Sequence, residues 1–310
     1  MVEVSVVMGV FNGAETLAET LASVLSQEGC ALEFIVVDDG STDASGRILS
    51  DWAARDPRLR VLSQGNIGLT RSLIRGCAEA SGEFIARQDA GDLSLPGRLG
   101  RQVLALREDA KSVAATCHTQ FIGPMGEPLY VSRVSEGELN ESLRRGTAPL
   151  RGPSHHGSIM MRRSAYVAAG GYRPQFHFAQ DLDLWTRLAE AGSFAVVDEA
   201  LYRARLAPGA ISGTHTMEQR RLALLIAQAT ELRRSGRDEA AALAEAARVR
   251  PVPASNKATR MARGNYFIGS CLLGSAPDSA RHYFREAVRQ DPLHWRAWLR
   301  LLQSYWGSQR

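Results

Sequence analysis

The chain has 310 residues, 45% of them apolar and 23% charged, which is the balance of a soluble globular protein with a substantial core. Its formal net charge of +4 comes almost wholly from arginine, because Lys111 and Lys257 are the only lysines. Basic and acidic residues are mixed along most of the sequence, whereas nucleic-acid readers gather basic residues on one face. The composition therefore indicates no nucleic-acid partner, and the positive excess suits an anionic substrate or a membrane surface.

The cysteines and the N-terminus indicate where the protein works. The four cysteines lie far apart and form no C-x-x-C pair, so neither a zinc site nor a disulfide framework is predicted. The opening "MVEVSVVMGVFNG" has no basic start, and its apolar run is too short for a signal peptide or a spanning helix. We expect a cytoplasmic protein, or one peripheral at the inner face of the membrane.

The first 90 residues alternate short apolar strands with amphipathic helices. Strands are predicted at Val4–Val10, Phe34–Val37, "RLRVLSQ" and "EFIAR", and helices after Gly13, from about Asp43 and over Leu69–Ala80. Continuous apolar strands separated by helices are typical of a parallel sheet that is covered on both faces. The predicted fold class is therefore α/β, with a Rossmann-like, mostly parallel sheet.

Polar residues follow three of these strands. They are Phe11 with Asn12, Asp38 with Asp39, and Asp89 with Asp92. The carboxyl ends of parallel strands meet at one edge of a sheet, where ligands bind. Carboxylates there can hold a divalent metal that neutralises a diphosphate. The alternative for each acidic turn is a helix cap or a solvated loop.

After residue 100 the periodic signal is weaker. It predicts a helix over Leu99–Arg107, a hairpin in "QFIGPMGEPLYV", a strand and short helix in "IMMRRSAYVAAGGY", and a helix in "AQDLDLWTRLAEAG". From about Thr216 the sequence is rich in Ala, Leu, Arg and Glu and is predicted to be entirely helical. We therefore predict two domains, 1–215 and 216–310.

The helical tail contains an internal echo. "EAARVRP" at 245–251 is repeated as "EAVRQDP" at 286–292, each after a helix rich in small residues. The second unit resembles a tetratricopeptide repeat, and the first resembles a degenerate one. Two units are fewer than a solenoid normally needs, so we expect them to pack on the first domain.

Six stretches carry a family resemblance over roughly residues 3–213. They are "VSVVMGVFNGAETLAETLASVLSQ", "EFIVVDDGSTD", "GEFIARQDAGDLSLPGRLGRQ", "HHGSIMMRR", "GGYRPQFHFAQDLDLWTRL" and "ISG". In this order they resemble the inverting family-two glycosyltransferases of the GT-A fold. The resemblance implies transfer of a sugar from a nucleotide-diphosphate sugar to an acceptor hydroxyl.

The resemblance also implies a donor site. Phe11 would stack on the nucleobase, Asp39 would accept hydrogen bonds from the base with Asp38 beside it, and Arg71 would meet the diphosphate. The full implied donor-nucleotide set is Val10, Phe11, Asn12, Asp38, Asp39, Arg71, Asp89, Ala90 and Gly91.

For the chemistry, the resemblance implies that Asp92 holds Mn²⁺ or Mg²⁺ and that Asp181 is the general base. Asp181 and Asp183 are two residues apart on a helix, so only one of them can face the site. Asp183 precedes Arg187 by four residues and is expected to form a surface ion pair.

Acceptor-side roles are assigned to His156 and Trp185. For His156, as for its neighbour His155, the alternative is a surface loop residue, and for Trp185 it is packing. We interpret His118, Cys117 and Met160 as core or structural residues.

The sequence departs from the family pattern at several positions. Gly9 replaces a proline, Ile74 an asparagine and Gln180 a glutamate. Leu206 or Ala207 stands where a histidine is common, and His215 is a candidate substitute. Gly91 removes the middle acidic group of the usual Asp-Ala-Asp-Asp, which predicts weaker ribose or metal affinity that a Gly91→Asp variant would raise.

The function predicted from the sequence is a metal-dependent glycosyltransferase that acts on a glycan, a lipid-linked saccharide or a protein. The alternative is a catalytically weak nucleotide-sugar-binding domain whose helical tail binds a protein partner or another copy of the chain. "HWRAWLRLLQSYWGSQR" at 294–310 mixes Trp and Arg as interfacial helices do. It could therefore contact a membrane, and the alternative is that it caps the repeat.

Overall fold

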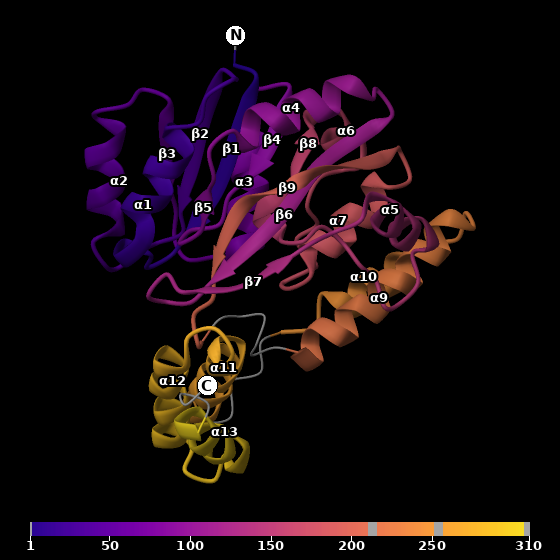
Figure 1. The fold of residues 1–310 in the computed structure, drawn as a ribbon. Helices are drawn as coiled ribbons and strands as arrows, with labels where there is room; N and C mark the ends of the chain where they lie inside the picture. Colours follow the sequence, from indigo (N-terminus) through magenta and orange to yellow (C-terminus); the bar gives the residue numbers. More distant parts are fainter. Residues whose placement is uncertain (1, 210–215, 251–256, 307–310) are drawn as a thin grey trace. The chain divides into compact units, whose positions relative to one another are not determined.

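The structure is a computed structural model that describes residues 2–209, 216–250 and 257–306. Its strands are β1 (Val4–Val10), β2 (Leu32–Asp38), β3 (Leu59–Ser63), β4 (Phe84–Arg87), β5 (Leu93–Ser94), β6 (Ser112–Ile122), β7 (Pro128–Ser132), β8 (Met160–Arg162) and β9 (Ser193–Arg205). They form one sheet in the order β3-β2-β1-β4-β8-β6-β9-β5, with β7 beside β6 (Figure 1).

The helices of the described chain are interspersed with strands up to β9, and only helices follow β9. They are α1 (Ala14–Leu25), α2 (Ser45–Ala53), α3 (Leu69–Ala78), α4 (Arg98–Glu108), α5 (Glu136–Arg145), α6 (Arg163–Ala168), α7 (Gln180–Leu188), α9 (Thr216–Arg234), α10 (Ala240–Ala246), α11 (Lys257–Leu272), α12 (Pro277–Gln290) and α13 (Trp295–Trp306). A short 3₁₀ turn, η1, covers His156–Ser158.

The sheet has a parallel half and a half that contains antiparallel pairs. β3, β2, β1 and β4 pair in parallel, as predicted. β8 then pairs antiparallel with both β4 and β6, and β5 pairs antiparallel with β9. The sheet is therefore mixed, because β8 and β5 run against their neighbours. β6 and β9 run in the same direction, since the Ser193 N–H donates to the Lys111 carbonyl at one end and the Leu206 N–H to the Ile122 carbonyl at the other.

Helices cover both faces of the sheet, which confirms the predicted layering. Alternate residues of β1 point to opposite faces. Val4, Val6 and Met8 pack with residues of α1, α2 and α4 in one core cluster. Val7 packs with residues of α3, α5, α6 and α7 in a second cluster. The loops that follow β1, β2 and β4 are thus held on a sheet that is packed from both sides.

The first compact unit comprises residues 1–119, 132–204 and 219–250. Within it, α9 and α10 share a core cluster with Phe176 and Phe178. Arg173 adds an ion pair with Glu239, with 2.6 Å between Nη2 and Oε1. α9 and α10 therefore belong to the same compact unit as the sheet. The sequence instead predicted that the helical domain begins at residue 216.

The second compact unit comprises residues 120–131, 205–218 and 251–310. α11, α12 and α13 share a core around Phe284 and Leu301. Tyr283 donates a hydrogen bond from its hydroxyl to Oε1 of Glu127 in the predicted hairpin (2.6 Å). Among the described residues, no helix is both long and apolar enough to cross a membrane. The described tail is helical, as predicted, and its assignment to tetratricopeptide repeats stays a prediction.

Candidate functional site

The loops after β1 and β2 are fastened to each other by hydrogen bonds. The backbone N–H of Asn12 donates to Oγ of Ser41 (3.0 Å), and Oδ1 of Asn12 accepts the backbone N–H of Thr42 (2.8 Å). The Asp43 carboxylate accepts the N–H groups of Ala14 and Ser45, at the starts of α1 and α2. Asp43 therefore caps two helices, and the two loops form a single polar surface at the edge of the sheet.

The two predicted base-binding aspartates lie at the end of β2 and are both buried. Asp39 accepts three hydrogen bonds, from Nε2 of Gln64 (2.7 Å) and from the N–H groups of Ile67 (3.0 Å) and Gly68 (2.8 Å). Asp38 accepts the N–H of Ser41 (3.0 Å). A carboxylate offers about four acceptor positions. Most of those of Asp39 are therefore occupied by donors of the loop 64–68.

Other residues of the predicted donor set stand close to these loops. The Phe11 ring follows β1 and is 49% exposed, whereas Val10 is buried. Arg71 is exposed in the first turn of α3. An exposed ring at a strand end offers a face on which a base can stack. The structure therefore leaves Phe11 and Arg71 open to solvent on the elements where the sequence predicts donor contacts.

The turn after β4 presents Asp89 and Asp92. The Asp92 N–H donates to the Asp89 carbonyl (3.2 Å), and Gly91 between them has a φ of +96°. The Gly91 N–H donates to Oγ1 of Thr20 (3.1 Å), which in turn donates to the Asp92 carbonyl (2.9 Å). Only glycine adopts such a φ without strain. The missing middle carboxylate thus coincides with a backbone conformation that disfavours any side chain.

Two fully buried arginines support this turn. Arg87 donates to Oδ1 of Asp89, to the Val7 carbonyl and, through Nε, to Nε2 of His156 (3.3 Å). Arg98 donates to the carbonyls of Arg87 (2.8 Å) and Gly157 (2.7 Å). Burial opposes ionisation of Asp89, but the Arg87 charge outweighs it, so the pKa of Asp89 lies below its usual range. Arg87 therefore favours the ionised form of Asp89.

Tyr202 of β9 connects the two aspartates. Its hydroxyl donates to Oδ2 of Asp92 (2.9 Å) and accepts the N–H of Asp89 (3.1 Å). Its ring lies 4.9 Å from the Arg98 guanidinium carbon and stacks on the His155 ring with 5.3 Å between centroids. No role was predicted from the sequence for Tyr202, Arg87 or Arg98. A signal was available for Tyr202 alone, because apolar and basic residues alternate over Tyr202, Arg203, Ala204 and Arg205.

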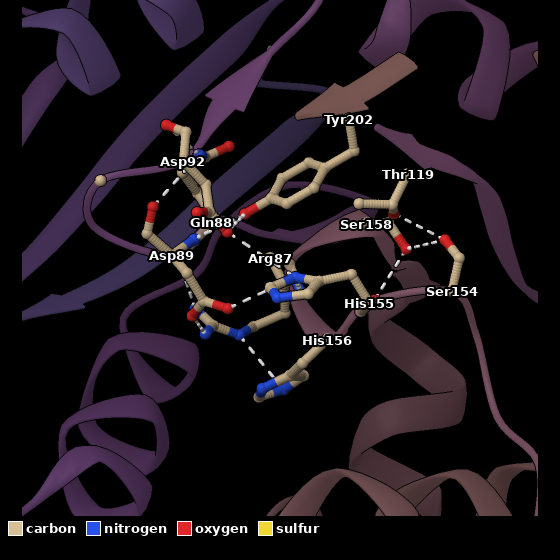
Figure 2. A network of polar contacts seen from close by, with 12 residues as sticks. Arg87, Gln88, Asp89, Asp92, Thr119, Ser154, His155, His156, Ser158 and Tyr202 are labelled. Carbon is tan, nitrogen blue, oxygen red and sulfur yellow. Dashed lines mark hydrogen bonds and ion pairs between the residues drawn. The ribbon is translucent and has the colours of Figure 1, made fainter. Parts of the chain in front are cut away.

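The two histidines of "HHGS" have different surroundings (Figure 2). Nε2 of His156 lies 2.7 Å from the Tyr172 hydroxyl, and burial followed by the Arg87 charge lowers the pKa of His156 to about 3. His155 instead places Nδ1 3.8 Å from Oδ2 of Asp89 and 3.7 Å from Oδ2 of Asp92. Burial lowers the pKa of His155 despite the Asp89 charge, so the ring is neutral at pH 7. Neither histidine is an exposed loop residue.

Asp89, Asp92 and His155 form a set of possible metal ligands. Each offers one ligand atom, and these atoms lie within 4.8 Å of one another. Two carboxylates and a neutral imidazole suit a divalent cation such as Mn²⁺. The residues present therefore fit the cation that the sequence predicts, and they add His155 to it.

Asp181 and Asp183 occupy different environments at the start of α7. Burial raises the pKa of Asp181 to about 6, Asp89 adds to the rise, and Arg87 opposes it. Asp183 is 1% exposed and pairs with Nη2 of Arg187 at 2.5 Å and with Arg173 at 3.5 Å. The predicted pair with Arg187 is present, but its placement on the surface was wrong, because α7 packs this face against the core.

The remaining predicted residues divide between the core and the segments that are not described. Trp185 is 4% exposed, and a Cβ on Gly152 would meet its ring at 2.1 Å, so its burial favours the packing alternative. His118, Cys117 and Met160 are buried, as predicted. His215 lies outside the described residues.

The site residues are a carboxyl with a raised pKa at the start of α7, a set of possible metal ligands, and two ordered loops at the edge of the sheet. A carboxyl with a pKa near 6 can accept a proton at neutral pH. A cation held by Asp89 and Asp92 can stabilise negative charge that develops on a phosphate. The arrangement is suited to moving a group from a phosphate to a hydroxyl.

Relatives in sequence are glycosyltransferases or polysaccharide-biosynthesis proteins by name. The chain is 38% identical over 211 residues to EpsE of Bacillus subtilis (strain 168), named as a glycosyltransferase, across 66% of this chain and 73% of EpsE. It is 25% identical over 192 residues to the amylovoran biosynthesis glycosyltransferase AmsE of Erwinia amylovora, across 61% and 70%. It is 29% identical over 236 residues to the succinoglycan biosynthesis protein ExoU of Rhizobium meliloti (strain 1021), across 71% and 67%.

Solved structures share the fold at low sequence identity. TarS 1–349 of S. aureus in complex with UDP-GlcNAc aligns with a TM-score of 0.56 and 16% identity, over 98% of this chain and 89% of TarS. The mannosyltransferase PcManGT of Pyrobaculum calidifontis, in complex with GDP-Man and Mn²⁺, aligns with a TM-score of 0.56 and 18% identity, over 98% and 84%.

A family profile gives the assignment. Residues 5–169, more than half of the chain, match Glycosyl transferase family 2. This match covers β1 to β8, the strands that carry Asp39, Asp89 and Asp92 at their ends. The sequence resemblance and the GT-A-like fold are thereby confirmed, and the chain belongs to glycosyl transferase family 2.

Proposed function

We propose that this glycosyltransferase is inverting and metal-dependent, and that it moves a sugar from a nucleotide-diphosphate sugar to an acceptor hydroxyl. The observation that carries the proposal is the combination of Asp181 with the Asp89, Asp92 and His155 set, since Asp89 acts on the pKa of Asp181. Attack of a hydroxyl on an acetal carbon needs proton removal from the nucleophile and charge stabilisation on the leaving group. The two groups supply one requirement each.

In this mechanism Asp181 removes the proton. Oδ1 of Asp181 accepts the Leu182 N–H (2.9 Å), which orients the carboxylate, and Oδ2 accepts the acceptor hydroxyl's proton. The acceptor oxygen forms a bond to the anomeric carbon while the bond from that carbon to the diphosphate oxygen breaks. Attack from the face opposite the leaving group inverts the configuration. When bound by Asp89 and Asp92, Mn²⁺ or Mg²⁺ supplies positive charge to the departing diphosphate.

The donor nucleotide would lie along the edge formed by the loops after β1, β2 and β4. We assign base stacking to Phe11, whose ring is half exposed. Asp38 and Asp39 receive the polar edge of the base, and Arg71 the diphosphate. The UDP-GlcNAc and GDP-Man bound by TarS and PcManGT support this donor class. The names of AmsE and ExoU favour a polysaccharide acceptor over a protein.

The test is a panel of UDP, GDP and dTDP sugars incubated with the purified chain and Mn²⁺, with release of the nucleoside diphosphate as the readout. We expect one donor to be hydrolysed or transferred, and Asp181→Asn to lower that rate by about 10²- to 10⁴-fold. Asp51→Asn, an exposed aspartate of α2, is the matched control and should leave the rate unchanged. Full activity of Asp181→Asn contradicts the base assignment, and silence across the panel favours a nucleotide-sugar-binding module.

We also propose that α13 contacts anionic membranes. Trp295, Trp298 and Leu302 are exposed on one side of this helix, whereas Ala297 and Leu301 are buried on the other. The helix contains Arg296 and Arg300 and no acidic residue, and Trp with Arg around an apolar stripe is typical of interfacial helices.

Co-sedimentation with anionic and zwitterionic vesicles tests this contact. The double variant Trp298→Ser/Leu302→Ser should lose binding to the anionic vesicles, and equal binding by the wild type and the variant would contradict it. Self-association or a protein partner through the helical tail stays a prediction.

A further inference from the structure

We propose that His155 is the nitrogen ligand of the divalent-metal site and that it makes this chain select Mn²⁺ over Mg²⁺. The inference rests on the proposed metal-dependent function, and it adds a ligand that the sequence analysis did not assign. It is carried by the convergence of a histidine from the loop before η1 with two aspartates from the turn after β4 (Figure 2).

The distances fit a shared cation. Nδ1 of His155 lies 3.8 Å from Oδ2 of Asp89 and 3.7 Å from Oδ2 of Asp92. Donor atoms bound to one cation at about 2.1–2.3 Å are separated by about 3–4.5 Å, from adjacent to opposite positions. The three ligand atoms can therefore reach one ion with small side-chain movements.

The hydrogen bonds at His155 select the tautomer that such a ligand needs. The Gly157 N–H donates to Nδ1 (3.1 Å), and because a backbone N–H can only donate, Nδ1 carries the lone pair and the proton is on Nε2. A metal would take this lone pair in place of the Gly157 N–H. The nitrogen that faces both carboxylates is thus the one able to ligate.

Tyr202 holds all three ligand residues in place. Its ring stacks on the imidazole at an interplanar angle of 23°, and its hydroxyl bonds to Oδ2 of Asp92 and to the N–H of Asp89. A Cβ on Gly157 would lie 1.9 Å from the Tyr202 hydroxyl oxygen, so the close approach of this chain segment requires glycine. Partners that orient ligands in this way are typical of metal sites.

Two residues that the family resemblance implies as metal ligands are absent from this sequence, and His155 could replace one of them. Gly91 replaces the middle acidic residue, and Leu206 and Ala207 occupy the region of the family histidine. A nitrogen donor from the loop before η1 restores a third protein ligand. Mg²⁺ prefers oxygen ligands in a strict octahedron, whereas Mn²⁺ accepts imidazole more readily. The site should therefore discriminate between the two ions.

The first measurement is Mn²⁺ binding by electron paramagnetic resonance, with Mg²⁺ as the competitor. We expect His155→Gln to weaken Mn²⁺ binding on the order of tenfold or more and to weaken Mg²⁺ binding less. His118→Gln is the matched control, since a ring nitrogen of His118 also lies near an aspartate, 2.7 Å from Oδ1 of Asp198, outside the proposed metal site. Equal losses of both ions in His155→Gln, or no loss of either, would overturn the proposal.

The second measurement starts from the wild type. Electron spin-echo modulation of Mn²⁺ bound to the wild type should show coupling to a directly bound nitrogen, and growth with ¹⁵N-histidine should change that coupling. The coupling should vanish in His155→Gln and persist in His215→Gln.

The outcomes separate this inference from the proposed function. Mn²⁺ bound without histidine coupling, or coupling that survives in His155→Gln, overturns the role of His155 but leaves metal-dependent transfer intact. Failure of Mn²⁺ to bind also overturns the role of His155. Transfer that continues in excess EDTA contradicts the metal dependence of the proposed function.

Discussion

The carboxyl ends of β2 and β4 both carry aspartates, but their partners differ. At the end of β2, Asp39 accepts three hydrogen bonds from residues 64–68 and so ties a loop to the sheet. At the end of β4, Oδ2 of Asp89 and Oδ2 of Asp92 both lie near Nδ1 of His155. Arg87 donates to the other oxygen of Asp89, and the Tyr202 hydroxyl donates to Oδ2 of Asp92. The partners of a carboxylate, rather than its place in the topology, therefore separate an aspartate that ties a loop to the sheet from aspartates that can hold a metal ion.

The same contrast is present within one helix. Asp183 of α7 forms ion pairs with Arg187 and Arg173, whereas Asp181 accepts only the Leu182 N–H among the hydrogen bonds described. Burial without a cation partner raises the pKa of Asp181 to about 6. Asp183 therefore has a structural role, and Asp181 has the properties of a base.

The largest expected effect on stability comes from removing the carboxylate charges of α7 one at a time. Asp183→Asn should lower the free energy of unfolding by about 3–5 kcal/mol, because it leaves the buried Arg187 without its carboxylate partner. Asp181→Asn should not lower it at pH 8, because the wild-type carboxylate is ionised there at a cost from burial. Urea unfolding of both variants measures the difference, and equal losses would break the contrast between the two residues.

A second pair of variants compares the ends of β2 and β4 directly. Asp92→Asn should weaken Mn²⁺ binding on the order of ten- to a hundredfold. It should change the melting temperature of the protein without nucleotide very little. Asp39→Asn should lower the melting temperature and leave Mn²⁺ binding unchanged, because its partners are donors of the loop 64–68.

Titration calorimetry with Mn²⁺ and thermal unfolding of both variants give the two readouts. A loss of Mn²⁺ affinity in Asp39→Asn would show that the two strand ends act as one site. Asp43→Asn controls for the loss of a carboxylate that only orders backbone, since Asp43 accepts N–H groups at the starts of α1 and α2.

Much of this arrangement could be predicted from the sequence, because it depends on local patterns. Apolar runs separated by amphipathic helices predicted β1 to β4, and the polar residues at their ends were correctly expected to share one edge. The antiparallel pairing of β8 and β5 could not be predicted in the same way. A strand was predicted in the segment that contains β8, but its direction was not, and β5 has two residues, too few for a periodic signal.

The residues that hold the site were harder to predict, since their roles depend on contacts between distant segments. Arg87 and Arg98 are indistinguishable in sequence from surface arginines, yet both are fully buried. Tyr202 lies 110 residues from Asp92 along the chain. The placement of Asp183 on the surface was wrong for the same reason: the sequence shows a spacing of four to Arg187 but not the packing around the pair.

The next prediction concerns pH and sharpens the contrast within α7. The pKa of Asp181 is about 6, so the base is ionised above this pH and the transfer rate should rise between pH 5 and 7, being about tenfold below its plateau at pH 5. The pKa of His156, at about 3, lies too low to contribute to this rise. Because the folded state raises the pKa of Asp181, its stability contribution is lost as pH rises through 6, and Asp181→Asn should lack this loss. A rate that is flat from pH 5 to 8 would contradict the assignment.

The smallest effect tests why the end of β4 carries glycine between its aspartates. From the sequence alone, Gly91→Asp was expected to raise metal or donor affinity. The backbone of Gly91 has a φ of +96°, and a Cβ there would lie 3.2 Å from Oγ1 of Thr16. Gly91→Asp and Gly91→Ala should therefore lose a similar amount of stability, about 1 kcal/mol, and neither should bind Mn²⁺ more tightly. If Gly91→Asp instead gained affinity without losing stability, the turn would tolerate a third carboxylate. We infer that the nitrogen of His155 compensates for a carboxylate that this turn cannot carry. A turn that tolerates Asp at position 91 would remove the need for His155 as the third ligand.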